Sequence, residues 1–123
     1  MKLTNEQIYS YTNKLLAEFS DKAELKLPIK INFYLQKNIQ TLKDLALEIE
    51  QSRMNIMKNY GKFKEDSTSL EISADKIEEA QKELIDLFSL EQDVQIYMID
   101  INKLDDSIVL SMSQMEALMF MIQ

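Results

Sequence analysis

Three adjacent carboxylate pairs are the side chains that come nearest to a catalytic set: Glu65-Asp66, Glu78-Glu79 and Asp105-Asp106. Two carboxylates can cleave a glycosidic bond when a cleft holds them at a fixed separation and their pKa values differ. These pairs fall where we expect loops or helix starts, and acidic side chains there are solvated or face the helix dipole. We therefore assign no catalytic residue and expect no enzymatic activity.

Two missing residue types exclude most other catalytic chemistry. The sequence contains no histidine, so the usual proton shuttle near neutral pH and the Ser-His-Asp and Cys-His triads are excluded. It contains no cysteine, which excludes a thiolate nucleophile, a disulfide and a zinc–thiolate site. A single glycine cannot form a phosphate-binding loop, and no calcium-loop pattern is present. We therefore expect no metal and no cofactor.

The net charge is −7, and Arg53 is the only arginine. Because arginine reads phosphates and guanine edges, its scarcity disfavours direct nucleic-acid binding. The charge is uneven: residues 1–64 carry a net +4 and residues 65–123 a net −11. Two interpretations stay open. The two halves neutralise each other, or the acidic half is presented to a basic partner.

The N-terminal residues lack the apolar core of a signal peptide, and no apolar run approaches the roughly 18–20 residues of a membrane span. We therefore expect a soluble protein in the cytoplasm of a host cell, without a membrane contact. Its 123 residues suit a single domain.

One long helix dominates the predicted fold, over residues 28–60, with Pro28 in its first turn and Gly61 after its end. Its apolar positions follow alternating spacings of three and four, and we call them the seam. The seam consists of Leu35, Ile39, Leu42, Ala46, Ile49, Arg53, Ile56 and Tyr60. Arg53 fixes the packing register, pairs with a carboxylate, or extends its charged end into water at the end of the bundle.

Three further helices are expected, over residues 5–20, 74–89 and 113–122. Thr4 with Gln7, and Ser113 with Glu116, form capping-box patterns, and Ser73 is a candidate cap for the third helix.

Alternating apolar residues predict a strand over residues 93–101, and a polar turn leads to a second strand at 108–110 that pairs back as a hairpin. A short strand is also indicated at residues 70–72. We therefore predict one mainly α domain (α+β) over residues 1–123. It is a helical bundle around one long helix, with a small β-hairpin and a C-terminal helix.

The C-terminal helix is apolar on nearly every side, so it either fills the core or forms a methionine-rich contact surface. Tyrosines off the seam, Tyr9, Tyr34 and Tyr97, are typical contact anchors. The candidate partner-binding residues are Tyr97, Asp105, Asp106, Met115, Met119 and Phe120.

Three segments, LPIKINFYLQKNIQTL, DVQIYMIDINKLDD and IVLSMSQMEALMFMI, together resemble small uncharacterised proteins of phages and prophages of Gram-positive bacteria. The resemblance covers residues 25–123. It implies a phage origin but transfers no activity and no functional residues. This chain lacks the glycine-containing variable loop expected after the long helix.

We therefore predict a non-catalytic, phage-encoded protein-binding module that inhibits or modulates a host protein or defence complex, as an anti-CRISPR protein does. Its partner would be a host or phage protein. One alternative is a homo-oligomeric phage structural or assembly accessory protein, built through the long helix and the C-terminus. Another is a protein that sequesters a small ligand, which the scarcity of arginine and glycine disfavours.

Overall fold

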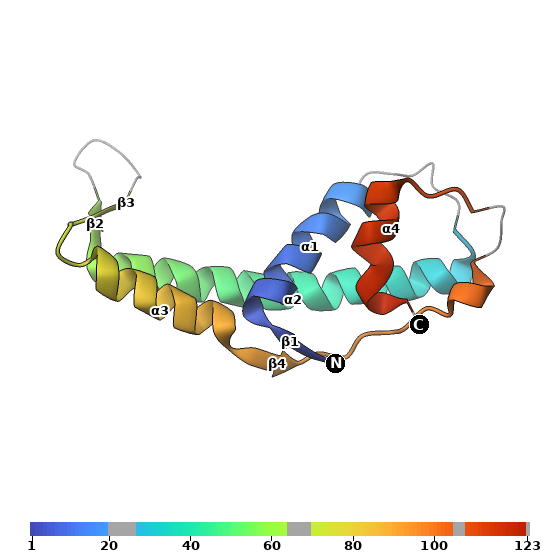
Figure 1. The fold of residues 1–123 in the computed structure, drawn as a ribbon, viewed down its shortest axis with the longest axis horizontal. Coiled ribbons are helices and arrows are strands. Elements are labelled where there is room, and N and C mark those ends of the chain that lie inside the picture. Colours follow the sequence, from blue (N-terminus) through green and yellow to red (C-terminus); the bar gives the residue numbers. More distant parts are fainter. Residues whose placement is uncertain (20–26, 64–69, 105–107, 123) are drawn as a thin grey trace.

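The computed structural model describes residues 1–19, 27–63, 70–104 and 108–122 (Figure 1). Within these ranges the predicted mainly helical fold is confirmed. The helices are α1 (Asn5–Phe19), α2 (Ile29–Tyr60), α3 (Ile77–Ser89) and α4 (Met112–Leu118). The long α2 is the axis of the molecule: α1 crosses its middle and packs against α4, while α3 runs antiparallel along its C-terminal half (Figure 1).

The seam predicted for α2 is its inward face. Leu35, Ile39, Leu42 and Ile49 are buried, whereas Arg53, Ile56 and Tyr60 towards the C-terminal end are only half-buried. The part of α2 that α1 crosses is buried, whereas its last turns contact only α3 and a pair of short strands among the described residues.

The ends of α2 differ in detail from the prediction. Pro28 is the N-cap and not a first-turn residue, and its carbonyl accepts the first helical bond from the Asn32 N–H. Gly61 follows the helix as expected, but its φ of −116° is extended and not left-handed. Glycine is needed there because a Cβ would lie 2.9 Å from the Met57 carbonyl oxygen and 3.2 Å from that of Glu71.

The C-terminal helix belongs to the core, since Ala117, Leu118 and Met121 are buried. Its predicted start was wrong. The capping box is formed by Ser111 and Gln114, each backbone N–H bonding the other's side chain at 2.9 and 3.1 Å.

The predicted pair for that capping box was Ser113 with Glu116. The Ser-x-x-Glu/Gln pattern occurs in two registers two residues apart, and the buried side chains of α4 decide between them. The last turn continues as the 3-10 segment η2 (Met119–Met121).

The predicted strand over 93–101 and its hairpin with 108–110 are also wrong. The strand is limited to β4 (Glu91–Asp93), which pairs antiparallel with β1 (Lys2–Thr4) in the register Lys2↔Asp93. Residues 94–98 form no strand, 101–103 form the 3-10 turn η1 (Ile101–Lys103), and 108–110 have no regular structure.

The alternating apolar residues led to a wrong prediction of a strand, because residues 94–99 lie across helices and not beside a second strand. Val94 and Ile99 point into the core in an extended chain. Their backbone groups bond other partners: Val94 exchanges two hydrogen bonds with Met1, and the Ile99 N–H donates to the Met121 carbonyl at 2.7 Å.

A second antiparallel pair closes the far end of α2. The predicted strand at 70–72 is confirmed as β3 (Leu70–Ile72), and its partner β2 (Gly61–Phe63) was not expected. Ser73 does not cap α3 with its side chain as predicted. Residues 74–76 form a turn in which the Ser73 carbonyl accepts from Lys76, and the helix begins at Ile77.

None of the helices in the described ranges is both long enough and apolar enough to cross a bilayer.

Candidate interaction surfaces

Of the three carboxylate pairs, the structure describes only Glu78-Glu79. Glu78 and Glu79 are exposed in the first turn of α3, and the pairs at 65–66 and 105–106 lie outside the described residues. Among the described residues, no three His, Cys, Asp or Glu side chains converge to hold a metal ion.

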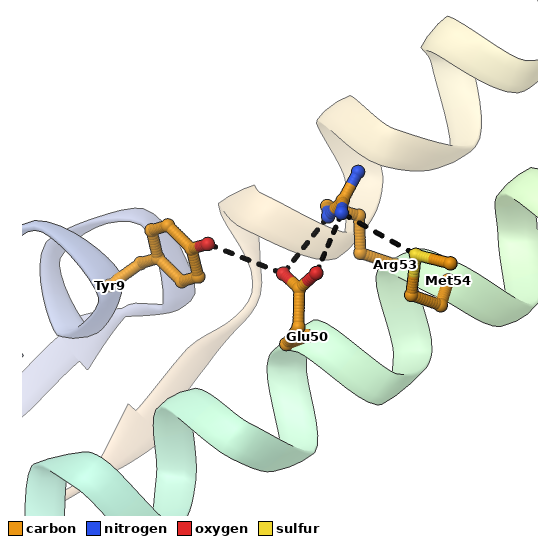
Figure 2. A network of polar contacts seen from close by, with 4 residues as sticks. All are labelled: Tyr9, Glu50, Arg53 and Met54. Atoms are coloured by element: carbon orange, nitrogen blue, oxygen red, sulfur yellow. Dashed lines mark hydrogen bonds and ion pairs between the residues drawn. The ribbon is translucent and has the colours of Figure 1, made fainter. Parts of the chain in front are cut away.

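The clearest charged network ties α1 to α2 (Figure 2). The Arg53 Nε and Nη2 atoms donate to the two carboxylate oxygens of Glu50 at 3.0 and 2.6 Å, and the Tyr9 hydroxyl donates to Glu50 at 3.3 Å. The hydrogen bonds from Arg53 hold the pKa of Glu50 below its ordinary value, and they raise the pKa of Arg53. Both oxygens of Glu50 are engaged, so this network joins helices and leaves no free base.

Arg53 thus pairs with a carboxylate, which is one of its predicted roles. That partner lies one turn earlier on the same helix, so the pair by itself does not set a packing register between helices. Tyr9 of α1 reaches the same carboxylate and links the pair to the neighbouring helix.

A buried amide on α2 holds the extended segment that follows β4. Asn38 is fully buried, and its Nδ2 donates to the Tyr97 carbonyl at 2.9 Å while its Oδ1 accepts from the Tyr97 N–H at 2.8 Å. Nδ2 also lies 3.4 Å from the Met121 sulfur. A buried amide without partners is costly, so these bonds both satisfy Asn38 and fix the backbone of Tyr97.

The fixed backbone sets the Tyr97 ring against α2. The ring stacks on Tyr34, one turn before Asn38, with centroids 5.2 Å apart and planes 19° apart. Two lysines of the same helix lie over aromatic faces: Lys30 Nζ is 5.7 Å from the Tyr34 centroid, and Lys37 Nζ is 5.5 Å from the Phe33 centroid. Such cation–π pairs favour fixed positions for both groups.

These side chains form a continuous exposed patch at the N-terminal end of α2, and we call it the aromatic–lysine surface. Ring and cation–π contacts join Lys37 to Phe33, Phe33 to Tyr34, and Tyr34 to Lys30 and Tyr97. Ile29 is 89% exposed and Phe33 56% exposed, and Ile101 is also exposed. The surface therefore consists of Ile29, Lys30, Phe33, Tyr34, Lys37, Tyr97, Ile101 and Lys103.

A cavity of about 170 Å³ continues this surface between α2 and η1, with Lys30, Tyr34, Asp100 and Lys103 in its lining. The Asp100 carboxylate accepts from the Asn102 N–H at 3.0 Å. Among the described residues of the patch, three lysines face one carboxylate, so it is locally basic on a chain whose net charge is −7.

Three of the other predicted contact residues, Met115, Met119 and Phe120, lie on α4 and η2. Asp105 and Asp106 lie outside the described residues. Phe120 is half-buried and stacks on Tyr11 at 4.4 Å, and Met115 is half-buried, whereas Met119 is exposed.

Sequence reasoning predicted Tyr97 as a contact residue and considered Tyr34, but missed the groups that position them. Asn38 could have been recognised because its spacing from Leu35 and Leu42 places it on the buried face of the helix, where a lone amide must bond to something.

A second exposed apolar region lies between α3 and the start of α1. A groove of about 400 Å³ there is lined by Glu6, Leu84, Ile85, Phe88 and Ser89, and we call it the α1–α3 groove. Ile85 is 65% exposed beside it.

A cavity of about 900 Å³ lies at the far end of α2, between Tyr60 and the start of α3. Its charged lining consists of Glu71, Asp75 and Lys76. A hydrogen bond from Ser73 holds the pKa of Asp75 below its ordinary value. This negative lining disfavours the phosphate-bearing ligand that a nucleotide-sequestering protein would hold.

Comparison with protein-family models, with curated proteins and with solved structures finds no match for this chain. Its function is therefore argued from its own surfaces. The resemblance to phage proteins and the expected host or phage partner stay predictions.

Proposed function

We propose that this protein is a non-catalytic protein-binding module that contacts its partner through the aromatic–lysine surface. The observation that carries the proposal is the exposure of four large apolar side chains beside three lysines. The apolar residues are Ile29, Phe33, Tyr97 and Ile101.

The exposed apolar area supplies the affinity. Burying a large apolar side chain completely contributes about 1.5–3 kcal/mol, and aromatic side chains dominate measured interfaces. Phe33 and Ile29 leave most of their area in water, so a partner that covers them gains most of that contribution.

The surface is also prepared for binding. Asn38 fixes the Tyr97 backbone from inside the core, and Tyr34 supports the Tyr97 ring. Little side-chain rotamer entropy would therefore be lost at Tyr97 when a partner binds, since preorganised contacts lower the entropic cost of association.

The charge of the surface indicates the chemistry of the partner. Lys30, Lys37 and Lys103 outnumber Asp100, so an apolar segment flanked by Asp or Glu complements the patch. Aromatic rings with lysines are also typical of proteins that bind single-stranded nucleic acid. The net charge of −7 and the lack of arginine on this surface favour an acidic protein segment instead. Occluding such a segment would inhibit a host protein, and the phage origin that the resemblance implies is consistent with that role.

Selection from a library of short random displayed peptides tests the proposal, with the purified protein as bait. We expect enriched peptides that combine Leu or Phe with Asp or Glu. Phe33→Ser should weaken their binding about tenfold or more, which corresponds to about 1.4 kcal/mol. Leu47→Ser is the matched control, because Leu47 lies on the same helix and is 60% exposed, close to the 56% of Phe33.

Failure to enrich any peptide would count against the proposal, as would equal binding by Phe33→Ser. Competition by single-stranded DNA at physiological salt would replace the protein partner with a nucleic acid. Sedimentation that shows a dimer lost in Phe33→Ser would instead favour the homo-oligomer alternative.

A further inference from the structure

We propose that the α1–α3 groove is a second binding site, and that it takes a basic amphipathic helix from a protein partner. This site lies apart from the aromatic–lysine surface and does not depend on the function proposed for it. Three observations support it: the incomplete burial of α3, the rigid walls of the groove, and the charge around it.

Helix α3 has a pronounced apolar face that is poorly covered. The predicted inner residues are Ile77, Ala80, Leu84, Leu87 and Phe88, yet only Ala80 is buried. In α1, by contrast, Ile8 and Leu15 are completely buried. An amphipathic helix contributes its apolar area to stability only where another element covers it. Part of the area of α3 is therefore left for another element to cover.

The groove is built from two elements that are hydrogen-bonded together. Asn5, at the start of α1, is buried, and its Nδ2 donates to the Leu87 carbonyl at 2.8 Å while its backbone N–H donates to the Leu90 carbonyl at 2.8 Å. Its Oδ1 accepts from Gln92 Nε2 at 2.7 Å. These bonds hold the first turn of α1 at a fixed place beside the last turns of α3.

The floor of the groove is fixed by an aromatic pair. The Phe88 ring meets the Tyr9 ring edge to face, with centroids 6.0 Å apart and planes at 85°. Tyr9 is itself held by Glu50 of α2 (Figure 2). A preformed apolar groove of this kind is what an incoming helix uses, with anchors spaced by three and four residues.

The charges around the groove determine which kind of helix can bind there. Helix α3, which forms one wall, carries four exposed acidic residues, Glu78, Glu79, Glu83 and Asp86, against the single ammonium of Lys82, and Glu83 is hydrogen-bonded to Tyr60 of α2. Glu6 adds a further carboxylate on the α1 wall. A second copy of α3 would bring four more carboxylates to the same place, and like charges in contact oppose binding. An amphipathic helix with Lys or Arg beside its apolar stripe complements both the groove and its rim.

The test measures fluorescence anisotropy of a labelled model helix of Leu and Lys, compared with the same pattern of Leu and Glu. We expect the Leu/Lys helix to bind at least about tenfold more tightly than the Leu/Glu helix, with affinity falling as salt rises. Because a cationic peptide is attracted to any acidic protein, the decisive variant keeps the charge unchanged. Ile85→Ser should weaken binding about fivefold to tenfold.

The matched control is Val109→Ser, another strongly exposed aliphatic residue away from the groove, and it should leave the affinity unchanged. Ile85 is exposed, so its variant is expected to fold, and circular dichroism checks this. Binding that is equal in Ile85→Ser and the wild type overturns the proposal, because charge alone would then explain it. Equal binding of the Leu/Glu helix also overturns it, as does self-association that Ile85→Ser abolishes.

Discussion

Replacing the buried amide of Asn38 tests the link between the core and the aromatic–lysine surface. Asn38→Leu keeps a side chain of similar size but removes both hydrogen bonds to the Tyr97 backbone. Each such bond contributes about 1 kcal/mol net, so we expect a loss of about 2 kcal/mol. Asn38→Ala also leaves a cavity beside Met121, which adds about 1 kcal/mol.

These values can be measured by urea unfolding followed by circular dichroism. A loss of 2–3 kcal/mol should lower the melting temperature by roughly 8–12 °C for a chain of this length. The surface has its own readout. Because the Tyr97 N–H loses its hydrogen bond to residue 38, its amide hydrogen should exchange with solvent faster. The NMR shifts of the Tyr34 and Tyr97 rings should also change as the stack loosens.

The reasoning would be refuted by Asn38→Leu having a stability within about 0.5 kcal/mol of the wild type and an unchanged Tyr97 ring spectrum. A large stability loss with unchanged Tyr97 exchange would show that Asn38 supports the core but not the surface. Asn38→Leu should also weaken binding of the selected acidic peptides, whereas a destabilising change far from the surface should not.

Three further predictions concern other parts of the fold. Ser111→Ala should cost about 1 kcal/mol of stability because the capping box of α4 is lost, whereas Ser113→Ala should change it little; comparison of their urea midpoints decides between the two registers. Leu118→Ala should cost about 2–5 kcal/mol, because this side chain is buried in the core, and a loss below about 1 kcal/mol would contradict the placement of the C-terminal helix there. The folded-state pKa of Glu50 lies below its ordinary value of 4.5, first because of hydrogen bonds from Arg53. Its contribution is therefore complete above the unfolded-state pKa and lost as the pH falls through the folded-state pKa, so the stability of Glu50→Gln should decline less than that of the wild type between about pH 7 and pH 3.

Local patterns predicted the helices well. The alternation of three and four along α2 identified its buried face, and the Thr4–Gln7 capping box placed the start of α1, where both expected bonds form at 2.9 and 3.1 Å. These signals depend on residues within two turns of each other, so they can be recognised in the sequence without knowledge of the rest of the fold.

Only part of the candidate surface could be predicted from the sequence. Tyr97 and Tyr34 were identified as contact residues, but Lys30, Phe33 and Asn38 were not. Their roles depend on which segment lies beside α2, and residues 38 and 97 are far apart in the chain.

The sequence by itself determined that the protein is mainly helical, that its longest helix has one apolar face, and that histidine and cysteine chemistry is excluded. Only the tertiary structure decided that residues 94–98 run across helices without a strand partner, and that Asn38 holds Tyr97 in place. The physical reason is that side-chain periodicity records which positions are buried, but not which backbone lies next to them. An extended chain can satisfy its backbone with a buried amide and a chain terminus as well as with a neighbouring strand.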